Sequence, residues 1–416
     1  MNEDPTRSAP ALVPGPPPAA RLLLRLAKAL HEHGTPAHRL EQSLARLAEA
    51  LELPSAQFLS TPTAMHVSFG EGPEQRVHLL RAPAERVDLD ALSELDAIVD
   101  ALVARRIDAS TAEARLTTLS ERPAPGSPRA SRWASAAASA SAAVFLGGGV
   151  LELGLAALLG AGVTALAQRL AGHPRAQGVH APLAALLVSF LVSTAAAMLP
   201  GLVDAVVLIS ALIMLVPGLS LTVAMTELAS GHVVSGTSRL AGAMTLMLTM
   251  LFGAALGRAL ASGAWVPGSW PTPTLPLPPG TWLAAIAAST LAFTVLLGAR
   301  ARDVGWIALI CLLSYGAATM GGRALGAELG AFVAATAVGM ASNAFARRLK
   351  RPATVLRLPG LLLLVPGSLG FRSLGSLLVA DTVAGTDGLF RVALVTVALA
   401  VGLFTADLLL PSRRSL

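Results

Sequence analysis

Two proline-glycine pairs interrupt long apolar stretches of this 416-residue chain, and polar side chains follow each pair. The residues concerned are Pro217, Gly218, Ser220, Thr222, Thr226 and Glu227 in the first stretch, and Pro366, Gly367, Arg372, Ser373 and Asp381 in the second. Proline removes a backbone hydrogen bond and glycine adds backbone freedom, so each pair predicts a broken or kinked helix. Freed carbonyls and half-helix ends can bind a small polar solute where they line a cavity. The simpler alternative is two packing kinks, since both residues are common in membrane helices.

Two ionisable side chains in this set, Glu227 and Arg372, are the strongest candidates for a role in transport. An ionisable residue within a membrane span is a functional candidate, and a titratable acid is the minimum requirement for proton coupling. The alternative for both is solvation at a helix end. Neither lysine of the chain, Lys28 or Lys350, stands in a Walker A sequence, which excludes an ATPase of that class. Uphill transport would therefore use an ion gradient.

Residues that could support catalysis or bind a metal do not form a recognisable pattern. His31, Glu32, His33 and His38 lack the H-E-x-x-H spacing, and neighbours two apart do not share a helix face. Solvated surface positions are therefore expected for them. Cys311 is alone in an apolar run, and no nucleophile elbow is present. The sequence predicts no enzyme, no cofactor and no metal, and leaves a membrane-bound hydrolase as the remoter alternative.

Composition divides the chain into a soluble and a membrane part. The whole chain is 54% hydrophobic and 13% charged, with a net charge of +6. Residues 1–132 contain 32 charged side chains, whereas residues 133–416 contain only 24, too few to cover a water-facing surface. Most positive charges of the second part lie in short loops, and they form no stripe with aromatics. Partners are therefore a lipid bilayer and small solutes, with no nucleic acid.

Ten apolar segments of the second part are each long enough to cross a bilayer. They cover about 133–149, 151–170, 182–200, 203–226, 238–261, 282–299, 304–321, 327–346, 357–379 and 388–410. Positive residues precede the first segment and follow every even-numbered one, with Arg323 as the exception, and the loop 263–281 has none. By the positive-inside rule, both termini are predicted to be cytoplasmic and that loop external.

The two halves of the membrane part repeat each other at a spacing of 149 residues. Leu215-Val-Pro-Gly218 falls on Leu364-Val-Pro-Gly367 without a gap, and Gly236-Thr237 falls on Gly385-Thr386. Each repeat contains five predicted helices, and an odd number inverts the second copy relative to the first. The expected fold is thus mainly α: a polytopic membrane protein with two inverted five-helix repeats, preceded by a small cytoplasmic α+β domain.

The predicted organisation has six parts. They are a disordered Pro-rich leader (1–20), a cytoplasmic α+β domain (21–121), a linker (122–132), a first membrane repeat (133–262), an external Pro-rich loop (263–281) and a second membrane repeat (282–411). Alternating residues predict three strands in the α+β domain, at 57–61, 65–69 and 76–81, and helical periodicity surrounds them.

Four segments together resemble the threonine/serine exporter family. They are LLRLAKALHEHGTPAHRLEQSLARLAEALEL, TPTAMHVSF, VPG…TELASGHVVSGTSRL and RRLKRPATVLRLPGLLLLVPGSLGFRSLGSLLVADT. The resemblance covers about residues 20–411 and implies ten membrane helices, a cytoplasmic domain and export of small amino acids driven by the proton motive force. The family's first motif usually has Asp where this chain has Glu227.

Three functions remain open at this point. The leading one is export of threonine and serine with protons, across a bacterial cytoplasmic membrane, by a protein that could form a homo-oligomer. The second is export of dicarboxylates such as succinate, favoured if Arg372 faces the cavity, because a second carboxylate needs a second cation. The hydrolase noted above is the third.

Overall fold

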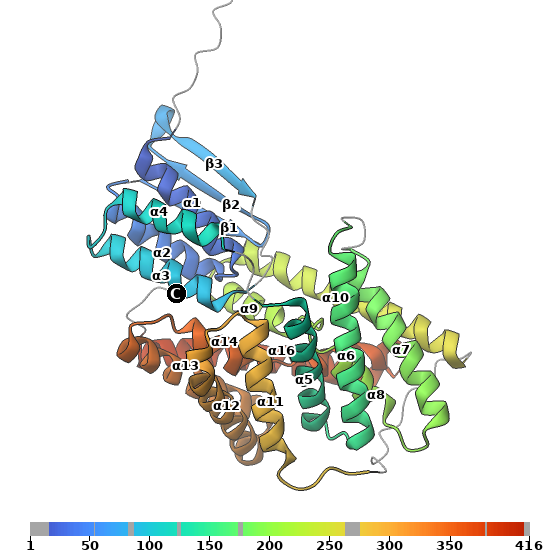
Figure 1. Cartoon of the computed structure of the whole chain (residues 1–416). Coiled ribbons are helices and arrows are strands. Elements are labelled where there is room, and N and C mark those ends of the chain that lie inside the picture. Colours follow the sequence, from blue (N-terminus) through green and yellow to red (C-terminus); the bar gives the residue numbers. More distant parts are fainter. Residues whose placement is uncertain are drawn as a thin grey trace, which may run out of the picture.

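The computed structural model describes residues 16–53, 55–81, 87–122, 126–173, 178–262, 275–378 and 381–411. Within them the chain forms a small α+β unit and a large helical part (Figure 1). Most of the predicted leader and of the predicted external loop, and residues 123–125 of the predicted linker, lie outside the described residues.

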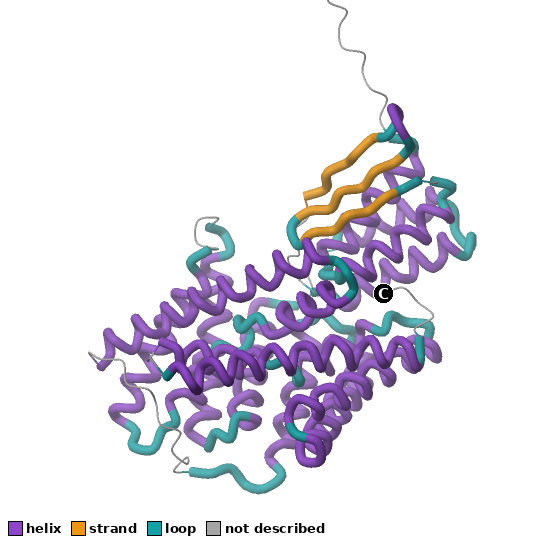
Figure 2. The backbone as a smooth tube through the Cα atoms, turned by 180° about the vertical axis from the view of Figure 1, so that it is seen from behind, coloured by secondary structure: helices purple, strands orange, loops and turns teal. Residues whose placement is uncertain are grey.

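The α+β unit contains a three-stranded antiparallel sheet of order β1-β2-β3. Its elements are α1 (Pro18–Glu32), α2 (Ala37–Ala50), β1 (Gln57–Thr61), β2 (Ala64–Phe69), β3 (Arg76–Arg81), α3 (Leu89–Val103) and α4 (Ala109–Ser120). The sheet lies on one side of the unit and the helices on the other (Figure 2). Met65 and Val67 of β2 point into a core of helix leucines, as alternation along a half-buried strand requires. The predicted strands are confirmed, with β2 starting one residue earlier.

The helical part consists of twelve α-helices among the described residues. They are α5 (Pro128–Phe145), α6 (Val150–Leu170), α7 (His180–Met198), α8 (Asp204–Ala211), α9 (Gly218–Ala229), α10 (Val233–Ser262), α11 (Thr281–Leu296), α12 (Val304–Leu325), α13 (Ala327–Leu349), α14 (Thr354–Leu362), α15 (Gly367–Leu378) and α16 (Thr382–Leu409). The helices α8 and α9 lie within one predicted span, and α14 and α15 lie within another. α5 begins five residues before the predicted segment, because Ser127 caps it and Pro128 occupies its first position.

Seven helical segments of the described chain are long and apolar enough to cross a membrane, as a polytopic membrane protein requires. They are Val150–Leu170, His180–Met198, Val233–Ala261, Ala301–Leu325, Ala327–Leu349, Thr354–Leu377 and Thr382–Leu409. α9 and α11 are apolar but shorter. The number of ten crossings stays a prediction.

Helices of the two halves correspond at the 149-residue spacing found in the sequence. α9 begins at Gly218 and α15 at Gly367, and α10 begins at Val233 and α16 at Thr382. Their packing also corresponds: α7 packs on α10 as α13 packs on α16, and α6 packs on α8 as α12 packs on α14. Both predicted helix breaks are confirmed, because a separate helix ends before each proline and a new one begins at each glycine.

The α+β unit is docked directly on the helical part. The Leu89 and Asp90 amides at the start of α3 donate to the Leu297 and Gly298 carbonyls after α11, at 2.8 and 3.1 Å. Arg300, beyond these carbonyls, pairs with Asp90 and Glu94 of α3. The unit is therefore held at one end of the helical part by main-chain and charged contacts.

Candidate functional site

The two Pro-Gly breaks meet inside the helical part. A Cβ added to Gly218 would lie 3.2 Å from the Gly367 Cα, and one added to Gly367 would lie 3.1 Å from the Gly218 Cα. Pro217 and Pro366 beside them are both buried. The backbones approach so closely that a side chain at either position would force neighbouring atoms to shift, which favours glycine at both.

The N-terminal ends of two half-helices consequently converge at this contact. α9 starts at Gly218 and α15 at Gly367, each within its own half of the sequence repeat. The amides of a helix's first turn have no partner within the helix, and this end carries the positive end of the helix dipole. Two such ends in one place favour a negatively charged group such as a carboxylate.

A cavity of about 270 Å³ lies next to the two half-helices, between α9, α10, α15 and α16. It is lined by Leu221, Met225, Leu240, Met244, Met247, Gly370, Leu374, Leu389, Val392, Ala393 and Thr396. Ten of these eleven residues form five pairs separated by 149 positions, so the cavity lies between equivalent surfaces of the two halves. Its wall is almost entirely apolar, and the Thr396 hydroxyl is used by the Val392 carbonyl.

The predicted hydroxyl residues lie along the half-helices but not on the cavity wall. Thr226 donates to the Thr222 carbonyl at 2.8 Å, and Ser373 donates to the Leu369 carbonyl at 2.8 Å. Thr222 is buried and donates to the Gly218 carbonyl at 3.3 Å. Ser220 is half-buried in the first turn of α9, two residues after Gly218.

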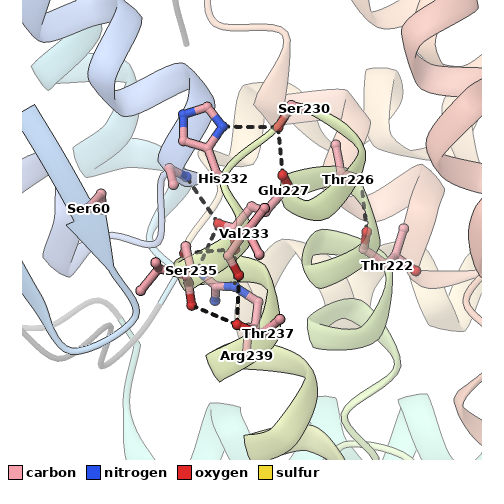
Figure 3. Close-up of polar contacts among 12 residues, drawn as sticks. Ser60, Thr222, Thr226, Glu227, Ser230, His232, Val233, Ser235, Thr237 and Arg239 are labelled. Atoms are coloured by element: carbon pink, nitrogen blue, oxygen red, sulfur yellow. Dashed lines mark hydrogen bonds and ion pairs between the residues drawn. The ribbon is translucent and has the colours of Figure 1, made fainter.

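Glu227 is completely buried in the last turn of α9 and is surrounded by donors (Figure 3). The Arg239 guanidinium donates to both carboxylate oxygens at 3.1 Å, and the Ser235 hydroxyl donates at 2.8 Å. The Ala37 amide, which belongs to α2 of the α+β unit, donates to Oε1 at 3.1 Å. The structure therefore places Glu227 at the junction with the α+β unit and not among the residues that line the cavity.

The other two charged candidates lie elsewhere. Arg372 is exposed in the second turn of α15, and it does not line the cavity. Asp381 is exposed and caps α16 by accepting a hydrogen bond from the Ala384 amide at 3.1 Å. The breaks, Ser220 and the threonines of α9 are thus brought together, whereas Asp381 serves the start of its own helix.

A second charge cluster, partly buried, was missed by the sequence reasoning. Asp407 of α16 accepts from Arg357 of α14 at 2.6 Å and from Asn343 of α13 at 2.8 Å. Arg39 of α2 also reaches the Asp407 carboxylate, at 3.1 Å. The available signal was an arginine and an aspartate placed inside apolar segments, since such residues are normally paired.

Histidines of the α+β unit are less solvated than expected. His31 is buried, and His38 lies beside Arg39 at the junction, so their prediction as surface residues is wrong. Burial, aided by the positive charge of Arg39, lowers the pKa of His38 to about 3. Burial and the nearby charge of Arg357 lower the pKa of Arg39 to about 10. His38 is accordingly neutral at physiological pH.

A many-helix membrane part with paired broken helices is typical of the class of membrane transporters. Sequence comparison refines this class. Residues 21–261 match the family described as "Putative threonine/serine exporter", and residues 281–409 match "Threonine/Serine exporter, ThrE". The chain belongs to the threonine/serine exporter family, whose members are membrane exporters and not enzymes.

Individual relatives are distant in sequence. The chain is 24% identical over 93% of its length to a "Probable threonine/serine exporter" of Mycobacterium tuberculosis, and it covers 75% of that protein. It is 28% identical over 58% of its length to a "Pheromone-regulated membrane protein 10" of Pichia sorbitophila, and 24% identical over 94% to that of Zygosaccharomyces rouxii. It spans only 24% and 42% of these two yeast proteins. No solved structure matches the chain.

Proposed function

We propose that this protein is a secondary active exporter of threonine and serine in a bacterial cytoplasmic membrane, driven by the proton motive force. The observation that carries the proposal is the contact between Gly218 and Gly367, in a chain that belongs to an exporter family. Broken helices that meet between two repeats are where secondary transporters bind their substrates.

The proposed topology has ten crossings in two inverted sets of five. α5, α6, α7, the α8–α9 pair and α10 form the first set, and α11, α12, α13, the α14–α15 pair and α16 form the second. Support comes from the 149-residue correspondence and from the odd number of crossings in each set. The α+β unit and both termini would then be cytoplasmic, in keeping with the positive-inside rule.

The substrate is proposed to bind at the converging half-helix ends. Its carboxylate would accept from first-turn amides of α9 and α15, and its hydroxyl would contact Ser220. A dicarboxylate exporter, the alternative, would need a further cation in the same place. Arg372, the candidate for that cation, is exposed in the second turn of α15, whereas Ser220 is half-buried in the first turn of α9, which favours the hydroxy amino acids.

Glu227 is the proposed proton-carrying group, and its surroundings set a condition on this role. All the hydrogen bonds found at this carboxylate are donated to it, from Ala37, Ser235 and Arg239. A proton could therefore bind to a carboxylate oxygen only after one of these donors moves away from it. Of the three donor residues, only Ala37 belongs to the α+β unit. Proton binding would thus be linked to movement of α2.

Transport into everted membrane vesicles tests the proposal. Labelled threonine and serine should accumulate inside vesicles that contain the full chain, and an uncoupler should abolish the accumulation. Labelled succinate serves as the competing substrate in the same vesicles. Accumulation of succinate without either amino acid, or amino-acid accumulation that ignores the uncoupler, would contradict the proposal.

A further inference from the structure

Two ion pairs occupy corresponding places in the two halves of the helical part. In the first half, Arg258 of α10 donates to Asp204 at the start of α8 at 2.6 Å. In the second half, Asp407 of α16 accepts from Arg357 in α14 at 2.6 Å. Arg258 and Asp407 are separated by the repeat spacing of 149 residues, so the same position carries opposite charges in the two halves.

Each pair joins the last long helix of its half to the first piece of its broken helix. α8 and α14 both precede the Pro-Gly break, and α10 and α16 both follow the second piece. Separation of the broken helix from the last helix at that end would therefore require the ion pair to open. A pair in this place can hold one end of the path closed.

The two pairs lie at different ends of the helical part. Asp407 also binds Arg39 of α2, so the second pair is adjacent to the α+β unit. In Figure 1, α14 lies beside that unit, whereas α8 lies away from it. This separation is what an inverted repeat produces, because equivalent residues of the two copies face opposite sides of the membrane.

The exposure of these side chains fits a contact that opens and closes. Asp204 is 13% exposed and Arg258 is 21% exposed, whereas Arg357 is 9% exposed and Asp407 is 32% exposed. A fully buried pair would be costly to separate, and a fully exposed pair would hold little. Partial exposure allows water to solvate the charges on separation.

We propose that Asp204–Arg258 and Arg357–Asp407 are the two gates of the transport path, and that Arg39 completes the second. The first closes the face away from the α+β unit, and the second closes the face beside it. The α+β unit thereby supplies part of a gate. This inference rests on the proposed transport function and its inverted topology, and it assigns positioning residues, which need not touch the substrate.

Opening one gate should expose the path from one side only, and this can be measured by cysteine labelling. Ser220→Cys is introduced as the probe into a full chain with Cys311→Ala, and a membrane-impermeant thiol reagent is applied to spheroplasts or to everted vesicles. Asp204→Asn should raise the labelling rate about tenfold in spheroplasts only, the change that about 1.4 kcal/mol gives. Arg357→Gln should raise the labelling rate about tenfold in everted vesicles only. Arg39→Gln should also raise the labelling rate in everted vesicles.

Matched controls separate gating from the general effect of removing an ion pair. Asp387→Asn removes the exposed Arg391 pair from the same helix as Asp407, and Arg25→Gln removes an exposed pair from the same unit as Arg39. Neither should change labelling from either side. The double variant Asp204→Arg, Arg258→Asp exchanges the two charges and should return the labelling rate toward that of the starting chain. Such a return would show that the fold is intact.

Two outcomes overturn the gates. One is an increase in the labelling rate from the same side for both Asp204→Asn and Arg357→Gln. The other is an unchanged labelling rate in both variants. Threonine transport measured on membranes that contain the chain with Ser220 intact keeps the two proposals apart. Active transport without sided labelling would reject the gates and retain the exporter, whereas sided labelling without threonine or serine transport would retain the gates and reject the substrate.

Discussion

Arg39 and Asp407 form an ion pair of 3.1 Å although 368 positions separate them in the chain. The pair joins the second helix of the α+β unit to the last membrane helix. Glu227, which accepts from the Ala37 amide two residues earlier, joins the same helix to the first half of the repeat. The beginning of α2 is therefore the place where all three parts of the molecule meet.

Acid should weaken this junction through His38. The pKa of His38 is lowered to about 3 in the folded protein, chiefly by burial, against about 6.5 when unfolded. The unfolded chain thus binds more protons between these values, so the neutral histidine's contribution is complete above about pH 6.5. It is lost as the pH falls toward 3, at about 1.4 kcal/mol per unit. Thermal unfolding at pH 7.5 and 5.5 measures this loss, and it should be smaller in His38→Asn.

The exposed His66 provides the control for this pH effect. His66→Asn should leave the stability difference between pH 7.5 and pH 5.5 unchanged, because replacing this exposed side chain leaves His38 buried as before. An equal pH dependence in the starting chain and in His38→Asn would contradict the assignment to His38.

Alanine at either glycine of the breaks should damage the protein. Gly218→Ala and Gly367→Ala each place a Cβ about 3 Å from the opposite backbone, which cannot move aside as a flexible side chain can. We expect a loss of about 1–3 kcal/mol in stability and of most threonine efflux. Gly162→Ala in α6, where a Cβ meets nothing within 4 Å, is the control and should retain both. Melting temperature and vesicle transport provide the measurements.

The contact between Gly218 and Gly367 also determines what is expected when a whole Pro-Gly pair is replaced by Ala-Ala. An isolated helix would gain from this change, because proline and glycine are poor helix formers. In the folded protein the Cβ at Gly218 meets Val365 and Gly367 instead. The double substitution is therefore expected to reduce stability together with transport, and a fully stable, active variant would show that the two breaks do not work as one unit.

Glu227→Gln should abolish gradient-driven efflux, whereas Glu227→Asp should retain activity because it keeps an acid near the same donors. The glutamine variant also leaves the Arg239 guanidinium without its anion, and removal of one partner of a buried pair costs about 3 kcal/mol. The double variant Glu227→Gln, Arg239→Gln should recover much of that stability and remain inactive. Efflux is measured with and without an uncoupler, and the thermal stability of each variant is measured beside it. Full gradient-driven activity in Glu227→Gln would remove this residue from the coupling mechanism.

The proposed topology predicts the sides of two reporter fusions. A reporter placed after Arg414 should be cytoplasmic, and one inserted in the 263–281 loop should be external, because positive residues are retained on the cytoplasmic side. Alkaline phosphatase and a fluorescent protein, which are active on opposite sides, make the measurement. Both fusions on one side would reject the five-plus-five arrangement.

The sequence alone determined the features that depend on local composition and spacing. The shortage of charge after residue 132 required a membrane part, alternation predicted the three strands, and Pro217 and Pro366 located the helix breaks. The 149-residue repeat also indicated which helices correspond. These features are readable because hydrophobic burial and proline sterics act on neighbouring residues and leave a periodic record.

Only the tertiary structure decided which distant groups meet. Periodicity could select Glu227 as an ionisable residue in a span, but it could not show that α2 supplies one of its donors. It likewise gave no reason to join Arg39 to Asp407, or to pair Arg258 with Asp204. A buried charge is stable wherever the fold provides an opposite charge or donors, and that partner can come from any part of the chain. Side-chain chemistry thus names the groups that need partners, and packing selects the partners.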